Sequence, residues 1–377
     1  MIFLNFVLME IDIMTGMGPT AEAIAHYVHG GVTVFFIIWT WLLWPQRKKN
    51  SMMYMLFLNM LYFAFCNVKD IIFLVDGYWE NFFLSGISVT LDLLYVPIVS
   101  NFFIEIVSPG WVTKRRVLVP MAVQAIFVPL FIIFPTQAVY DLALYFALAG
   151  GAVAFILVCV LLHRHRKYIF DNYSYTEHID VSWAINCVVL LFICLGLYVV
   201  AFKEETWLSG AVFQIACVCT WLYLYCLSRC HSVVDMPPLS IFEFPWIRNE
   251  GTPSEDDSVS DAYSSIAMRL EECMEKEKIY LNPKLSLQDV AAKVGTNRTY
   301  LSDYLNHVQN ITFYEYINRM RVREACLIID SMPADNPLSM QSVADMSGFN
   351  SISTFNRSFT KTVGMPPSEY AKKRSAS

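Results

Sequence analysis

Residues 285–305 read LSLQDVAAKVGTNRTYLSDYL, and a related stretch at residues 343–359 reads VADMSGFNSISTFNRSF. Both stretches share a valine, an alanine and a glycine at the same spacing: Val290, Ala291 and Gly295, then Val343, Ala344 and Gly348. A small alanine lets a second helix approach closely, and a glycine provides the left-handed turn between two helices. The repeat therefore predicts two helix-turn-helix units in the last part of the chain.

The first of these units carries its own helix start signals. Ser286 and Asp289 have the spacing of a weak capping box, and Asn297 is placed to cap the helix after the glycine. The residues expected to face inward are Leu287, Val290, Val294, Leu301 and Leu305, and those expected to face outward are Arg298, Thr299, Ser302, Asp303 and Asn306. This layout is typical of a helix-turn-helix whose second helix enters a DNA major groove.

A long helix is predicted between the two units, from Phe313 to Ile329, and it is followed by Pro333 and Pro337. In the second unit a helix capped at Ser351 is expected to continue through Phe355 and Phe359. Before the first unit, Ile266, Leu270 and Met274 recur at spacings of four, which indicates one more amphipathic helix. The last part of the chain thus has the pattern of an ordinary soluble helical domain.

Three stretches together resemble the DNA-binding domain of the AraC/XylS family of bacterial regulators. They are LSLQDVAAKVGTNRTYLSDYL (285–305), FYEYINRMRVREACLII (313–329) and VADMSGFNSISTFNRSFTKTVGMPPSEY (343–370). The resemblance covers roughly the last quarter of the chain. It implies two helix-turn-helix units joined by one rigid helix, with two recognition helices inserted into successive major grooves about one helical turn apart. The implied partner is double-stranded DNA.

The same resemblance assigns residues that face bases and residues that pack the fold. Carried over by position, the DNA-binding candidates are Arg298, Thr299, Ser302 and Asp303 in the first unit, and Ile352, Ser353, Asn356, Arg357 and Lys361 in the second. The apolar residues expected to mark the fold by core packing are Leu287, Ala291, Leu301, Tyr316, Ala325, Phe349, Phe355, Phe359 and Tyr370. Asn310 stands where the family usually has a glycine, and asparagine also tolerates a left-handed turn.

The composition points to lipid for the rest of the chain, since 56% of its 377 residues are hydrophobic and only 16% are charged. Apolar runs long enough to cross a membrane follow one another from Ala23 to Ser228. About seven spans are predicted: Ala25–Trp44, Met53–Val75, Phe82–Val107, Val117–Phe134, Ala138–Leu162, Val181–Ala201 and Trp207–Leu227. The fold class expected is therefore all-α, with a membrane bundle followed by a double helix-turn-helix domain.

The loops between these runs alternate in charge, and the rule that positive loops stay inside assigns a topology. The positive loops contain Arg47, Lys48, Lys49, Lys114, Arg115, Arg116, Arg164, Arg166 and Lys167, and the acidic loops contain Asp76, Glu80, Asp141, Glu204 and Glu205. This places the N-terminus outside and everything after Ser228 in the cytoplasm of a bacterium. An odd number of spans likewise puts the two ends of the bundle on opposite sides of the membrane.

Four domains follow from these patterns. Residues 1–22 are an external N-terminal segment, residues 23–230 the membrane bundle, residues 231–262 a cytoplasmic linker rich in proline and acidic residues, and residues 263–377 the DNA-binding domain. The true start is either Met1 or a later methionine such as Met14 or Met17.

Charge and cysteine usage limit the possible chemistry. The formal net charge is -6, so any DNA-binding patch is local. From Lys284 onward 11 basic residues face 8 acidic ones, a net of about +3, which predicts modest affinity and strong salt dependence. The 10 cysteines lack zinc-ligand spacing and no enzyme motif is evident, so we expect neither metal, nor cofactor, nor catalysis.

Five ionisable residues fall in the outer half of the predicted bundle: His26, His29, Lys69, Asp70 and Asp92. Charges at membrane depth face the bundle interior and have partners, and they are functional candidates by default. Two readings stay open. The residues surround one polar ligand pocket, or they include a structural ion pair such as Lys69 with Asp92.

The sequence thus favours a membrane-bound sensor and transcription regulator in the bacterial inner membrane. Its expected partners are DNA, the lipid bilayer and an unidentified small-molecule or membrane signal, and a homodimer stays open. One alternative is a transporter or membrane enzyme with a regulatory DNA-binding tail, which would need inverted repeats or a lined substrate path. Another is a passive membrane anchor from which proteolysis at the linker releases the regulator.

Overall fold

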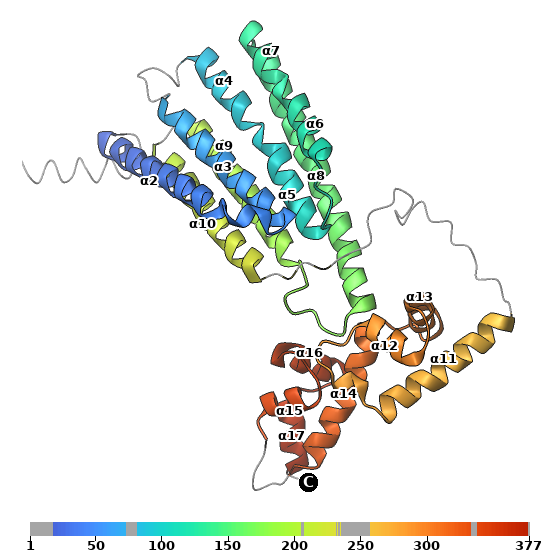
Figure 1. Cartoon of the computed structure of the whole chain (residues 1–377). Coiled ribbons are helices and arrows are strands. Elements are labelled where there is room, and N and C mark those ends of the chain that lie inside the picture. The colour runs from blue at the N-terminus through green and yellow to red at the C-terminus, as the bar shows by residue number, and fades with distance from the viewer. Residues whose placement is uncertain are drawn as a thin grey trace, which may run out of the picture. The chain divides into compact units, whose positions relative to one another are not determined.

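A computed structural model describes residues 18–72, 81–204, 207–230, 232, 234, 257–332 and 338–375 (Figure 1). The expected external segment up to residue 17, the loop that carries Asp76 and Glu80, and most of the expected linker lie outside these residues. The chain divides into two compact units, one within Met1–His165 and Val181–Pro238, the other within Arg166–Asp180 and Leu239–Ser377. Within the described residues all regular structure is helical, apart from one isolated antiparallel bridge between Tyr173 and Ser286.

The first unit is a bundle of long apolar helices. Six helical segments among the described residues are long and apolar enough to cross a membrane, and they coincide with six of the seven predicted spans. The helix α9 occupies the remaining predicted span, Val181–Ala201. The elements are α2 (Pro19–Leu43), η1 (Gln46–Lys48), α3 (Ser51–Ile72), α4 (Phe82–Asp92), α5 (Tyr95–Val107), α6 (Lys114–Ala125), α7 (Phe127–Ile133), α8 (Gln137–Asn172), α9 (Trp183–Glu204) and α10 (Trp207–Cys230).

Two predicted spans are each made of two helices, and a proline explains each break. Pro97 lies in the first turn of α5, and Pro129 lies in the first turn of α7. A proline ring clashes with the carbonyl four residues earlier and lacks an N–H donor. The preceding helices α4 and α6 accordingly end at Asp92 and Ala125, within five residues of these prolines.

The predicted end of the fifth span at Leu162 is wrong as a helix boundary. The helix α8 has 36 residues and continues to Asn172, so Arg164, Arg166 and Lys167 lie on a helix and not in a loop. Hydropathy marks where apolar residues stop, whereas arginine and lysine are themselves good helix formers. About ten residues of α8 therefore follow the apolar run, which corresponds to roughly 15 Å of helix.

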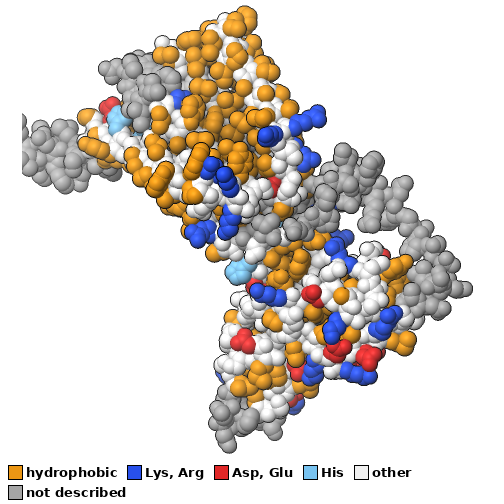
Figure 2. All heavy atoms as spheres, viewed as in Figure 1, with side chains coloured by type: hydrophobic (Ala, Val, Ile, Leu, Met, Phe, Trp, Pro, Cys, Tyr) orange, Lys and Arg blue, Asp and Glu red, His pale blue; other side chains and the backbone are white. Residues whose placement is uncertain are grey.

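Aromatic side chains pack the centre of the bundle, and apolar side chains cover its outside. Trp221 on α10 lies 5.8 Å from Phe63 and 5.9 Å from Phe102, measured between ring centroids. Phe36 stacks on Phe63 at 4.8 Å. In Figure 2 orange hydrophobic side chains dominate the visible face of this unit. A surface of this kind suits contact with lipid tails and not with water.

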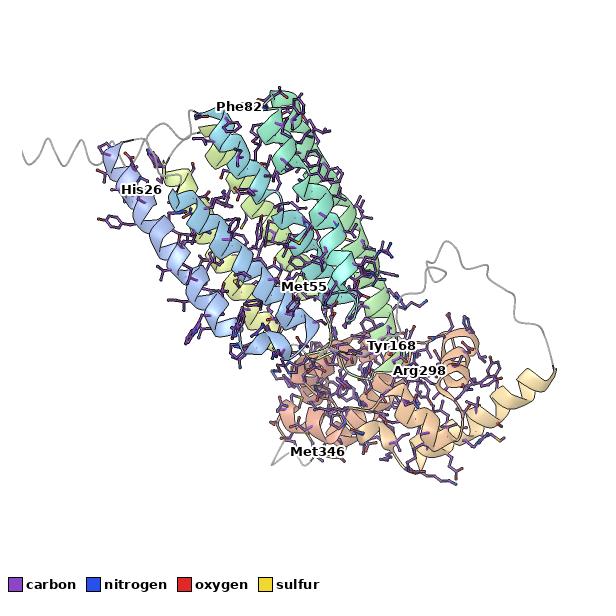
Figure 3. The ribbon with its side chains drawn as sticks, turned by 45° about the horizontal axis from the view of Figure 1, so that its top comes forward. His26, Met55, Phe82, Tyr168, Arg298 and Met346 are labelled. Carbon is purple, nitrogen blue, oxygen red and sulfur yellow. The ribbon has the colours of Figure 1, made fainter. Side chains whose placement is uncertain are left out.

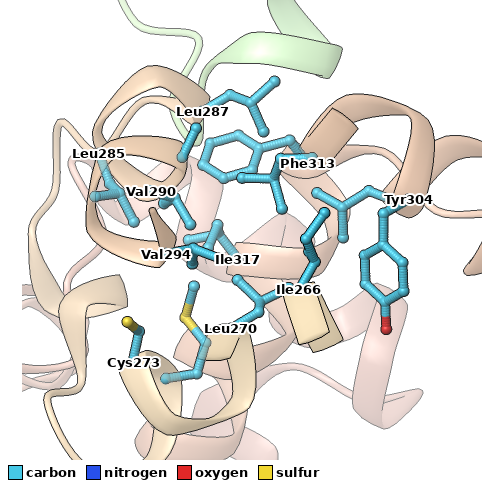
Figure 4. Packing of buried hydrophobic residues seen from close by; sticks show 14 of the residues in the cluster. Ile266, Leu270, Cys273, Leu285, Leu287, Val290, Val294, Tyr304, Phe313 and Ile317 are labelled. Carbon is cyan, nitrogen blue, oxygen red and sulfur yellow. The ribbon is translucent and has the colours of Figure 1, made fainter. Parts of the chain in front are cut away.

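The second unit holds the predicted helix-turn-helix pair. Its amphipathic first helix buries Ile266, Leu270 and Met274 as expected, and Figure 4 shows how this helix packs with Leu287, Val290 and Ile317 in one core. Its elements are α11 (Asp257–Glu275), η3 (Ile279–Leu281), α12 (Leu287–Val294), α13 (Arg298–Asp303), a π-helical turn η4 (Tyr304–Val308), α14 (Phe313–Asp330), α15 (Met340–Met346), α16 (Ile352–Val363) and α17 (Pro367–Ser375).

The residues expected to mark the fold behave as core residues. A second core forms around Val343, Ala344 and Phe355. Of the predicted set, Leu287, Ala291, Leu301, Ala325, Phe349, Phe355 and Phe359 are at most 2% exposed, while Tyr316 and Tyr370 are partly buried against the two cores. Asn310 has a φ of 49°, so it makes the left-handed turn expected of it.

The two repeated glycines differ in how strongly the structure requires them. Both have positive φ, 70° at Gly295 and 83° at Gly348. A Cβ at Gly295 would meet only the end of the Arg269 side chain at 3.2 Å. A Cβ at Gly348 would lie 2.6 to 2.8 Å from backbone atoms of Leu281 and Tyr280, which cannot move aside easily.

We predict that Gly348→Ala lowers the free energy of unfolding of the C-terminal compact unit by about 3 kcal/mol or more. Two costs add here, the strain of a left-handed backbone and the clash with the backbone of Leu281 and Tyr280. Gly295→Ala should lose only about 1 to 2 kcal/mol from the strain alone. Urea unfolding of the full chain in nanodiscs, followed by pulse proteolysis of the C-terminal part, measures both variants. Equal losses would contradict the close approach at Gly348.

Candidate DNA-binding surface

The first helix-turn-helix is built by local hydrogen bonds that the sequence predicted. Ser286 and Asp289 form the complete capping box of α12. The side chain of Asn297 accepts a hydrogen bond from the backbone N–H of Tyr300 at 2.9 Å and so caps α13. Leu301 is fully buried under this helix. The outward face of α13 is thereby fixed, and it carries the candidate contacts.

The predicted contacts of α13 differ in exposure. Thr299 is exposed, whereas Arg298, Ser302 and Asp303 are half-buried. Ser302 accepts a hydrogen bond from the side chain of Asn306 at 3.2 Å. The four residues occupy one short helix of six residues. Among these four residues only Thr299 is exposed.

The second recognition helix, α16, presents a more open set. Its cap is Ser351, whose side chain accepts from the backbone N–H of Thr354 at 3.2 Å. Ile352 is half-buried, and the candidates with exposed side chains are Ser353, Asn356, Arg357 and Lys361. These side chains lie on the face opposite the buried Phe355 and Phe359. The helix therefore has one face packed in the core and one face exposed to solvent, as expected of a helix that enters a major groove.

Two basic side chains of α16 are held by neighbours on the linking helix α14. Arg357 donates a hydrogen bond to the Tyr314 hydroxyl at 3.0 Å. Lys361 donates to Glu315 at 2.6 Å, and this bond lowers the pKa of the Glu315 carboxyl. An arginine oriented by one partner keeps N–H donors for a base edge.

Arg321 on α14 is a buried cation that sequence reasoning counted among the surface charges. It is 0% exposed, so it cannot meet DNA, and the expected charge surplus at the surface is smaller by one. All five of its N–H donors are satisfied by neutral oxygens: Tyr280 O at 2.8 Å, Asn282 O at 2.7 Å, Ser174 O at 3.0 Å, Ser174 Oγ at 3.0 Å and Asn318 Oδ1 at 3.3 Å. Burial lowers the pKa of Arg321 to about 10, so it stays charged at neutral pH.

Two of those oxygens belong to Ser174, which lies in the loop between the fifth and sixth predicted spans. This loop with the end of α8, Arg166–Asp180, belongs to the same compact unit as the C-terminal domain, and we call it the 166–180 segment. Ser174 is 0% exposed, and both its N–H and its hydroxyl donate to Leu285 O, at 3.2 Å and 2.8 Å. The segment is thus an integral part of this unit.

The 166–180 segment also contacts the N-terminal end of each recognition helix. The guanidinium of Arg298 lies 5.4 Å from the ring centre of Tyr168, and its Nη1 is 3.5 Å from the tyrosine hydroxyl (Figure 3). Such a cation over an aromatic face is attractive. Arg298, a predicted DNA contact, is therefore engaged by the segment.

Glu177 makes the corresponding contact at α16. Its Oε1 accepts from the hydroxyls of Ser351 and Thr354, both at 2.5 Å, and its Oε2 accepts from the Asn350 amide at 3.2 Å. Burial would raise the pKa of the Glu177 carboxyl, but these hydrogen bonds outweigh burial and lower it. A charged carboxylate is consequently bound at the N-terminal end of the second recognition helix.

Sequence reasoning missed Ser174, Glu177 and Arg321. One signal was present, because Arg321 lies between Ile317 and Ala325 at spacings of four, on the buried face of an amphipathic helix. A second signal is the aromatic content of residues 168–175, YIFDNYSY, directly after the basic residues Arg164, Arg166 and Lys167. Neither signal identifies the partner.

In the bundle, three of the five predicted ionisable residues come together. Lys69 Nζ lies 2.7 Å from Asp70 Oδ1 and 3.1 Å from Asp92 Oδ1, and it also contacts the Ser88 hydroxyl. Lys69 is only 5% exposed. The arrangement is a buried lysine between two carboxylates, which includes the ion pair that one reading expected.

The two histidines contact other groups among the described residues. His29 Nε2 lies 3.1 Å from the Asn67 carbonyl, and His29 Nδ1 lies 2.6 Å from the Gln214 side chain. His26 is 3.6 Å from Glu22 and its ring lies 5.3 Å from that of Trp207. His29 thus links α2 with α3 and α10, and His26 contacts the first residue of α10.

Two helix-turn-helix units joined by one helix define a double helix-turn-helix domain. A family model described as a helix-turn-helix domain matches residues 290–373. The melibiose operon regulatory protein, from two strains of Escherichia coli, is 33% identical over 88 residues, which are 23% of this chain and 28% of that protein. The C-terminal domain of the two-component response regulator yesN from Fusobacterium nucleatum is 22% identical and covers 29% of this chain and 98% of its own, with a TM-score of 0.24.

The C-terminal part of this chain is therefore an AraC-type helix-turn-helix domain, as the resemblance implied. The chain spans only 28% of the length of the curated relatives it matches. The family assignment accordingly concerns this domain alone.

For the bundle we predict that Lys69→Met lowers the amount of inserted protein strongly, because two neighbouring carboxylates lose their cation. Asp92→Asn should be milder, since Lys69 keeps Asp70 at 2.7 Å. Quantification of membrane-inserted protein together with target-gene output separates the two readings. Normal abundance and normal signalling in the Lys69→Met, Asp92→Asn double variant would exclude a ligand pocket at these residues.

Proposed function

We propose that this chain is a membrane-bound, sequence-specific DNA-binding transcription regulator whose bundle senses a signal. The observation that carries the proposal is the AraC-type double helix-turn-helix domain behind a set of apolar helices of spanning length. In this proposal residues 263–377 bind double-stranded DNA, and residues 23–230 form the sensor in the bacterial inner membrane.

DNA binding is proposed to use the two recognition helices in successive major grooves. The exposed side chains of α16, above all Ser353, Asn356 and Arg357, support this role because they lie on the open face of a rigid helix, where the Tyr314 hydroxyl orients Arg357. Arg357 is suited to bidentate recognition of guanine. Thr299, Ser302 and Asp303 are the corresponding candidates on α13. Arg298 at the start of α13 and Lys361 near the end of α16 complete the proposed surface.

The sensor role is favoured over a passive anchor by one observation. The 166–180 segment, which connects two predicted spans, lies in one compact unit with the DNA-binding domain. A rearrangement of those spans therefore has a physical route to the domain, whereas an anchor would need only the linker. The signal itself is proposed to act on the polar residues of the bundle, His26, His29, Lys69, Asp70 and Asp92.

The topology can be tested with reporter fusions. We predict a cytoplasmic reporter after Arg229, and an external reporter in the loop that carries Asp76 and Glu80, because positive loops stay inside. Alkaline phosphatase and green fluorescent protein fusions read opposite sides of the membrane. A cytoplasmic result for the second loop would contradict the assigned span order.

DNA recognition can be tested with paired variants of α16. Arg357→Ala should weaken binding to a selected site by about 1 to 3 kcal/mol and relax the preference at one base position. Lys361→Ala is the matched control, which we expect to weaken all sequences alike and to reduce the salt slope by about 1. Both are measured by fluorescence anisotropy with the full chain in nanodiscs. Identical behaviour of the two variants would contradict base reading by Arg357.

A further inference from the structure

The N-terminal end of α16 already holds an anion. The Glu177 carboxylate accepts hydrogen bonds from the Ser351 and Thr354 hydroxyls and from the Asn350 amide. These three donors belong to the turn and to the first residues of the recognition helix. Ser351 is also the helix cap. The positive end of the helix dipole favours a negative charge at this point.

These are the groups that a DNA-binding helix offers to a phosphate. Helix N-termini and short hydroxyl side chains bind backbone phosphates and set the register of a recognition helix on the duplex. A carboxylate and a phosphate present similar acceptor oxygens and the same sign of charge. One set of donors cannot be saturated by both, and the two anions repel each other at close range.

Glu177 does not act alone, because the 166–180 segment spans the domain. Tyr168 engages Arg298 at the start of α13, Ser174 is fixed by Arg321 in the middle of α14, and Glu177 lies at the start of α16. Phe170 adds a ring contact to Tyr314 at 4.9 Å. Both recognition helices are thus bound by one continuous stretch of 15 residues.

We propose that the 166–180 segment is an internal partner of the DNA-binding surface that competes with DNA, with Glu177 in the position of a backbone phosphate. The proposal rests on the proposed function, because it assumes that α13 and α16 bind DNA. The docked segment keeps the regulator silent. A signal that moves the neighbouring spans releases the segment and exposes the donors.

If the segment competes with DNA, the measured association constant equals the intrinsic one multiplied by the fraction of molecules in which the segment is released. Couplings between two sites in proteins commonly amount to a factor of about 5 to 150. Loss of the Glu177 charge should therefore raise DNA affinity, although it removes hydrogen bonds from the protein. A segment that merely supports the fold would have the opposite effect.

The test uses the full chain in nanodiscs and a fluorescent duplex enriched by the wild-type chain from a random library. We expect Glu177→Gln to bind this duplex at least about fivefold more tightly than wild type. The matched control is Glu272→Gln on α11, which removes the same charge from an exposed ion pair with Lys276. The control should change affinity by less than about twofold, as expected for a surface charge.

A second readout follows the segment itself by hydrogen exchange. The Ser174 N–H is bonded to Leu285 O, so it should exchange slowly in the free protein. Saturating duplex should speed its exchange in the wild-type chain if DNA displaces the segment. Thermal unfolding of each variant verifies that the domain stays folded.

The outcomes separate the two proposals. Unchanged or weaker binding by Glu177→Gln, or an equal gain in Glu272→Gln, would overturn the competition while DNA binding itself stands. Slower Ser174 exchange on DNA would overturn it as well, because the segment would then belong to the bound state. Failure of the wild-type chain to enrich any duplex, with no binding by either variant, would overturn the proposed function and the competition with it.

Discussion

The C-terminal compact unit depends on the hydrogen bonds of one buried cation, Arg321. Arg321 has no exposed surface, and its five N–H groups all end on neutral oxygens from three separate parts of the chain. A buried charge without its hydrogen bonds is strongly unfavourable. While the 166–180 segment is docked, the backbone near Tyr280 and Asn282, the helix α14 and the residue Ser174 therefore hold one another in position. Leu281 lies between Tyr280 and Asn282, in η3, and its backbone approaches Gly348 at the turn of the second helix-turn-helix.

Local chemistry explains most of what the sequence alone could predict. The cap at Ser286, the left-handed turns at Gly295 and Asn310, and the spans of apolar residues each depend on a few neighbouring residues, so pattern reasoning located them. Ser174 lies 147 residues from Arg321, and the three partners of Glu177 at α16 lie 173 to 177 residues away along the chain, and no local pattern specifies such contacts. The length of α8 was missed for another reason, because hydropathy reports the end of the lipid-like run and not the end of the hydrogen-bonded helix.

The bundle shows the same principle that polar groups in an apolar medium must be paired. Lys69 lies between Asp70 and Asp92, and His29 joins α2 to α3 and α10 through Asn67 and Gln214. Lys69 thus has one carboxylate partner on its own helix, Asp70, and one on α4, Asp92. These contacts join α3 to α4, and α2 to α3 and α10, inside the bundle.

The separation of 147 residues between Ser174 and Arg321 has a consequence for the order in which a molecule is made. The ribosome completes Ser174 and Glu177 before it begins α9, α10 and the whole C-terminal domain. Contacts of such long sequence separation form late, and domains generally fold as they emerge. The loop is thus already anchored by its flanking helices when the domain folds, and being on the same chain it is present at a high effective concentration. Each newly synthesised domain meets this loop before it meets the chromosome.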